Sequence, residues 1–238
     1  MNNIDILSRD KIDNEAEKFL MKYRPKALKK ATKLDLEALI ENDLEVEIDY
    51  QNLDKDHQIL GATIFRDGYM EVYNNEKKEL KKFKSNTMIF DIQLSEDYKQ
   101  AGRFLFTLAH EIGHWVLHKK YFFIDEGQQS IFDYCSKEEK SSIICAKRSE
   151  TDMIRVRKKT EQEWVEWQAD NFASSILMPK QVFKLTYEEL KKKYLDKEKI
   201  LEELSRIFGA SKKACEIRIN ILYNKSISYD NQTIIEVE

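Results

Sequence analysis

RFLFTLAHEIGHWVLH, residues 103–118, is the most informative segment of this 238-residue sequence. Its apolar residues recur at helical spacing and leave no ordinary solvated face, so the pattern predicts a buried helix over 101–118. A second apolar helix is predicted over 162–178, and Pro179 ends it because proline cannot continue a helix interior. These two helices are the expected centre of the core.

The composition favours a folded, helix-rich protein. Charged residues make up 35% and hydrophobic residues 42% of the chain, a balance that can bury apolar surface and that argues against disorder. Only 6 glycines and 2 prolines occur, which disfavours a turn-rich sandwich or barrel. The formal net charge of −3 does not indicate that the chain as a whole binds nucleic acid or an anionic membrane. Any DNA contact would therefore depend on a local basic surface.

A cytoplasmic location is expected from what the sequence lacks. No apolar run reaches 18 residues, and the start, MNNIDILSRDK, has no basic region followed by an apolar one, so neither a membrane span nor a signal peptide is predicted. The 3 cysteines form no CxxC pair and are odd in number, which disfavours a disulfide framework. A reducing compartment is the simplest setting.

The sequence upstream of these helices predicts two short helices and a small sheet. The helices are expected over 12–23 and 35–40 from their apolar spacing. Strand-like patterns occur at 44–50, 62–65, 69–73 and 87–92. An Asp-Gly at residues 67–68 separates two of them and predicts a hairpin, and a basic polar stretch at 77–84 precedes the last. We therefore expect an α+β fold with a small, mostly antiparallel sheet, followed by C-terminal helices.

His110, Glu111 and His114 form the motif HExxH. On a helix the two histidines lie one turn apart on one face, so both imidazoles can bind a single Zn²⁺, with Glu111 placed as general base beside the attacking water. The alternative is a pair of hydrogen-bonded core histidines beside a glutamate. That interpretation requires the fold to provide hydrogen-bond partners for several buried polar groups that would have no function. The motif therefore predicts one zinc per chain.

The third ligand is less clearly marked. His118 lies eight residues from His110, about 12 Å along the helix axis, which is too far to share the ion. We expect His118 to pack in the core, and the alternatives are a contact with a ligand histidine or a position facing the substrate. In the second helix, Glu166 and Asp170 lie one turn apart and would repel each other unless a cation were near.

Glu166 is therefore the predicted ligand, and Asp170 is predicted to accept a hydrogen bond from the ring N–H of a ligand histidine. A solvated acidic edge is the alternative for this pair, and Glu163, one turn earlier, is the rival ligand.

Two stretches resemble the ImmA/IrrE-type zinc metallopeptidase family. RFLFTLAHEIGHWVLH is similar to the family pattern RFTLAHELGHxxLH, with Leu105 as one extra residue, and EWQADNFA followed by ILMP, residues 166–179, is similar to ExxANxFAxxLLMP. The resemblance covers about residues 12–179. It implies a gluzincin-like peptidase domain with zinc on His110, His114 and Glu166, and with Glu111 as the base.

The predicted organisation has three parts: a metallopeptidase domain at 1–179 that includes a long, lid-like insertion at 119–161, a helical region at 180–225, and a tail at 226–238. The helical region resembles a helix-turn-helix, with Gly209 at the turn and Ser211 as the cap of the next helix. Packing of these helices on the peptidase domain is favoured over direct DNA binding.

By resemblance, the substrate is a helix-turn-helix transcriptional repressor of a phage or mobile element, cleaved at one site, and no membrane partner is implied. The alternative is a regulatory protein- or DNA-binding module whose metal site is structural or vestigial, and a hydrolase of non-peptide amides is a third hypothesis. The residue that stabilises the oxyanion is left open among His118, Tyr69, Tyr73 and Tyr121.

Overall fold

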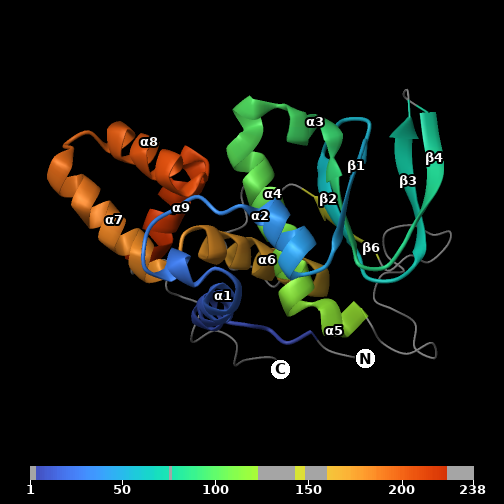
Figure 1. Cartoon of the computed structure of the whole chain (residues 1–238), viewed down its shortest axis with the longest axis horizontal. Helices are drawn as coiled ribbons and strands as arrows, with labels where there is room; N and C mark the ends of the chain where they lie inside the picture. The colour runs from blue at the N-terminus through green and yellow to red at the C-terminus, as the bar shows by residue number, and fades with distance from the viewer. Residues whose placement is uncertain (1–3, 75–76, 123–142, 148–159, 224–238) are drawn as a thin grey trace. The chain divides into compact units, whose positions relative to one another are not determined.

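The structure is a computed structural model that describes residues 4–74, 77–122, 143–147 and 160–223 (Figure 1). The chain divides into two compact units. The first unit contains residues 1–4 and 36–149, and the second contains residues 5–35 and 150–238. The second unit is therefore built from both ends of the sequence.

The first unit is organised around a four-stranded mixed sheet with the strand order β1-β5-β2-β6. These strands are β1 (Glu47–Gln51), β5 (Thr87–Asp91), β2 (Ile59–Ile64) and β6 (Ile143–Lys147). β1 runs parallel to β5, whereas β5 and β6 both pair with β2 in the antiparallel sense. β5 and all but the first residue of β2 are buried, as expected for apolar strands covered on both faces. The predicted α+β fold is confirmed, and β6 was not predicted.

The remaining strands, β3 (Gly68–Asn74) and β4 (Lys77–Phe83), form a separate two-stranded antiparallel sheet. The hairpin expected around Asp67-Gly68 is therefore wrong, because β2 pairs with β5 and β6 and not with β3. The physical reason lies in β2, which is buried on both faces and fits the interior of a larger sheet. Asp67 instead accepts a hydrogen bond from the backbone N–H of Ser85 at 2.8 Å.

Opposite faces of β2 contact different partners. Ala62 and Ile64 belong to an apolar cluster that also contains Val72 of β3 and Phe83 of β4. Thr63, between them in sequence, belongs to the other face, along which helix α4 (Ala101–Leu117) runs (Figure 1). The other short elements of this unit are α2 (Leu36–Ala38), a π-helical turn (Leu39–Asp43), α3 (Ile92–Glu96), a 3-10 turn (Tyr98–Gln100) and α5 (Lys119–Phe122).

The second unit is helical. Its elements are α1 (Arg9–Tyr23), a 3-10 turn (Pro25–Leu28), α6 (Glu161–Leu177), α7 (Lys180–Lys193), α8 (Lys197–Phe208) and α9 (Lys212–Tyr223). α1 packs on α6, where the rings of Phe19 and Phe172 meet edge to face with centroids 5.7 Å apart. The turn predicted between α8 and α9 is confirmed, because Gly209 has φ 72° and Ser211 Oγ accepts a hydrogen bond from the Ala214 N–H.

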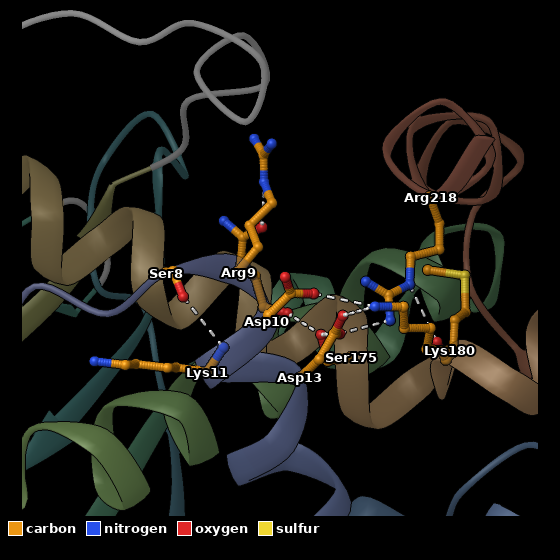
Figure 2. A network of polar contacts seen from close by, with 10 residues as sticks. Ser8, Arg9, Asp10, Lys11, Asp13, Ser175, Lys180 and Arg218 are labelled. Carbon is orange, nitrogen blue, oxygen red and sulfur yellow. Dashed lines mark hydrogen bonds and ion pairs between the residues drawn. The ribbon is translucent and has the colours of Figure 1, made fainter. Parts of the chain in front are cut away.

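A buried polar network joins α9 to α1 and α6 (Figure 2). Arg218 Nη2 donates to Asp13 Oδ1 at 2.9 Å, and its Nε donates to the carbonyl oxygen of Met178 at 3.2 Å. Ser175 Oγ donates to the same Asp13 oxygen at 2.6 Å. Both members of the ion pair are buried. The network therefore ties the C-terminal helix to the start of the chain within one unit.

Two predictions fall largely outside the described part of the chain. Within the expected insertion at 119–161, the structure describes only α5, β6 and residues 160–161, and the tail at 226–238 lies entirely outside it. Among the helices described, none combines the length and the apolar character needed to cross a bilayer.

Candidate metal centre

α4 brings the two motif histidines together in a buried position. The exposed fraction is 6% for His110 and 0% for both Glu111 and His114. His110 Nε2 and His114 Nε2 lie 2.9 Å apart. Two nitrogens bound to one tetrahedral zinc at 2.0–2.1 Å would be separated by about 3.3 Å. The pair therefore converges closely enough to bind one ion, as the i, i+4 spacing predicted.

The environment of His114 favours the neutral imidazole. Burial lowers the pKa of His114 well below its ordinary value, and the neighbouring His110 and His118 lower it further. A histidine must be neutral to offer a nitrogen lone pair to a metal ion. The surroundings of His114 therefore disfavour the protonated imidazolium, which cannot bind a metal ion.

His118 lies directly behind His114. It follows the last residue of α4 as the C-cap, it is buried, and its Nδ1 is 3.2 Å from His114 Nδ1. The two nitrogens of the His114 ring thus have different neighbours: Nε2 faces His110, and Nδ1 faces His118. A contact of this kind can fix the tautomer and orientation of a ligand histidine. Of the roles considered for His118, its contact with His114 fits the one of orienting a ligand histidine.

Strand β2 shapes the place that Glu111 occupies. Thr63 Oγ1 donates a hydrogen bond to Glu111 Oε2 at 2.6 Å, and both residues are fully buried. At Gly61, an added Cβ would lie 2.8 Å from Glu111 Oε1 and 3.0 Å from Thr107 Cγ2, so a larger residue there would force the Glu111 carboxylate to shift. Sequence reasoning missed both residues. The available signal was a glycine inside a strand, which often marks a close approach.

Replacing Thr63 by valine, which has nearly the same shape, is expected to reduce the free energy of unfolding by about 2 kcal/mol, because a buried carboxylate loses a donor. Urea denaturation in the presence of a chelator measures this loss. Thr107→Val is the matched control: the Thr107 hydroxyl donates only to the backbone oxygen of Arg103 within α4, so a loss of less than about 1 kcal/mol is expected. Equal losses for the two variants would contradict the importance of the Thr63 hydrogen bond.

On α6, in the second unit, the acidic residues have different surroundings. Thr160 and Glu163 form a capping box: Glu163 Oε2 accepts from the Thr160 N–H at 2.7 Å, and the Glu163 N–H donates to Thr160 Oγ1. Glu163, the rival ligand, is thus exposed and part of the helix cap. The carboxylate oxygens of Glu166 are buried, and Asp170 follows one turn later in a partly exposed position.

The chemistry of these side chains matches a zinc site. The predicted ligands are His110 and His114 on α4 in the first unit and Glu166 on α6 in the second. Two imidazole nitrogens and one carboxylate oxygen are a donor set used by catalytic zinc, which keeps its fourth position open. The donor set therefore fits the ion that the sequence predicted.

Residues 138–220 match the family model of peptidase M78, described as the IrrE N-terminal-like domain. The resemblance to the ImmA/IrrE family is thereby confirmed. The matched region includes Glu166 and begins after the HExxH motif of α4. A comparison with curated proteins gives no significant match. Similarity to the ImmA/IrrE family supports a function of the metallopeptidase type.

Proposed function

We propose that the protein is a zinc-dependent endopeptidase in which His110, His114 and Glu166 bind one zinc ion and Glu111 is the general base. The observation that carries the proposal is the arrangement on α4. There, the two Nε2 atoms converge at 2.9 Å, and the residue between the two histidines is held against β2 by Thr63. A buried carboxylate kept in one orientation is what a general base requires.

The chain's own residues have distinct tasks in peptide hydrolysis. When bound, zinc would polarise the scissile carbonyl and lower the pKa of a water molecule. Glu111 accepts the proton of the attacking water and passes it to the leaving amine. Thr63 fixes the orientation of the Glu111 carboxylate, and His118 fixes the ring of His114. Asp170 is assigned the same orienting task for a ligand histidine.

Metal analysis tests the ligand assignment. The full chain is expected to bind about one equivalent of zinc, and His110→Ala is expected to lose it because a catalytic site has only three protein ligands. Competition with a coloured chelator measures the bound zinc. Glu163→Ala is the matched control and should retain the metal, since Glu163 caps α6. A full equivalent bound to His110→Ala would overturn the assignment.

The proposed substrate is a helix-turn-helix repressor of a phage or mobile element, met in the cytoplasm. This part of the proposal is supported by the family resemblance alone. A small helix-turn-helix protein encoded beside this gene is the substrate to test, by incubation with the zinc-loaded chain and mass analysis of the products. A repressor that stays intact would contradict the substrate assignment and would leave the metal site untouched.

A further inference from the structure

β2 is the strand that contacts Glu111. The Thr63 hydroxyl donates to one carboxylate oxygen, and Gly61 leaves room for the other. On one side β2 pairs with β5, and on the other it pairs with β6. Without β6, β2 would be an edge strand, and its outer row of N–H and C=O groups would be open for pairing with another chain.

β6 runs past the same two residues. It pairs with β2 in the antiparallel sense, with Ile144 opposite Thr63 and Ala146 opposite Gly61. The register shifts between Ile59 and Gly61. Neighbouring strands lie about 4.8 Å apart, so the β6 backbone lies one strand spacing from the residues that hold Glu111.

An extended peptide is the form of substrate that such an edge can bind. Addition of a strand to a sheet edge gives main-chain hydrogen bonds whatever the peptide sequence, and it aligns the backbone that is to be cut. A peptide paired with β2 would occupy the line that β6 now occupies, and two strands cannot pair with one edge at the same time. β6 belongs to the long segment between α4 and α6, within this same chain.

We propose that the outer edge of β2 is the binding edge for an extended polypeptide substrate, and that β6 occupies it as an internal competitor. The inference rests on the proposed peptidase function. Because β6 is tethered, its effective concentration is in the millimolar range, which places a free peptide at a disadvantage. The chain is therefore autoinhibited, and cleavage requires a substrate or partner that displaces β6 from β2.

The test uses a fluorescein-labelled peptide with the sequence of residues 142–148 and serine in place of Cys145, and its binding is measured by fluorescence anisotropy. Two full-length variants change the occupancy of the edge in opposite directions. Ile144→Pro with Cys145→Pro weakens β6 pairing, because successive N–H groups of a strand alternate in direction and one of the two must face β2. Ala62→Cys places a thiol opposite Cys145, its Cα partner, so that oxidation can lock β6 onto β2.

The proline variant is expected to bind the peptide at least about 10-fold more tightly than the unmodified chain, by removal of the tethered competitor. The oxidised Ala62→Cys protein, prepared with Cys135→Ser to prevent mispairing, is expected to bind none, and reduction should restore binding. Ala62→Ser is the matched control and should behave like the unmodified chain. Equal affinity in all proteins, no binding to any of them, or failure of the disulfide to form would each overturn the proposal.

The same measurement separates this inference from the proposed function. Strand pairing requires no metal ion, so the order of affinities is expected to be the same with zinc and with a chelator. If the order holds in a chain that binds no zinc, β6 still competes with peptides for the edge of β2, but the peptidase proposal fails, and with it the assignment of the bound peptide as a substrate. If zinc binds normally and the affinities are equal, only the occupied edge fails.

Discussion

Glu111→Gln is expected to reduce peptide hydrolysis about 10²- to 10⁴-fold, the usual contribution of a general base, while zinc binding and folding are retained. The amide has the size of the carboxylate, and its oxygen can still accept the hydrogen bond that Thr63 donates. What it cannot do is accept the proton of the attacking water. Cleavage of the proposed repressor substrate, followed with zinc content and urea denaturation, measures all three properties.

The matched control for this prediction is Glu71→Gln, which removes an exposed carboxylate of β3 that pairs with Lys78. Its cleavage rate is expected to equal that of the unmodified chain. If Glu111→Gln kept more than about a tenth of the activity, a rate loss below the range for general bases, Glu111 could not be the base. If Glu111→Gln lost its zinc or its fold, the rate loss would not identify a base either, and the chemical assignment would be overturned.

Arg218→Met is expected to lower the free energy of unfolding by about 3–5 kcal/mol, because it removes the buried cation that is hydrogen-bonded to Asp13 and leaves only Lys180, whose Nζ lies 4.0 Å from Asp13 Oδ2. The effect is large because the pair is buried and because Arg218 also donates to the carbonyl oxygen of Met178 (Figure 2). Urea denaturation of the full chain, with circular dichroism as the readout, measures the loss.

Two further variants show whether burial is the cause. Lys180→Met breaks the more exposed pair with Asp10 and a longer contact with Asp13 at 4.0 Å, and a loss of less than about 1 kcal/mol is expected. Adding Asp13→Leu to Arg218→Met removes the uncompensated charge and should recover most of the stability. Similar small losses for Arg218→Met and Lys180→Met would show that the buried pair contributes no more than a surface pair.

Helical spacing alone predicted the elements that carry the site. α4 and α6 lie within a residue or two of the expected bounds, and the turn at Gly209 has the expected backbone geometry. These features could be predicted because helix periodicity, proline and capping residues act over one or two turns of the chain. The approach of His110 and His114 follows from the same local geometry.

Strand pairing could not be predicted in the same way. Asp67-Gly68 suggested a hairpin, but the partner of a strand depends on which faces are buried, and β2 needs strands on both sides. For the same reason β4 was taken for a polar stretch, although its lysines and Phe83 pair with β3. The hydrogen bond that Thr63 donates to Glu111 could not be predicted, because the two residues lie 48 positions apart in sequence. The pair of Asp13 and Arg218, 205 residues apart, has no local signature at all.

The construction of the second unit from both chain ends has a consequence during synthesis. The apolar face of α1, which includes Phe19, is synthesised well before its partner Phe172 on α6. At ribosomal rates of about 5–20 residues per second, α1 waits on the order of 10–30 s for that partner. The intervening residues can fold as they emerge from the ribosome. The nascent N-terminal helix must meanwhile be shielded, and we expect it to be the segment that chaperones hold.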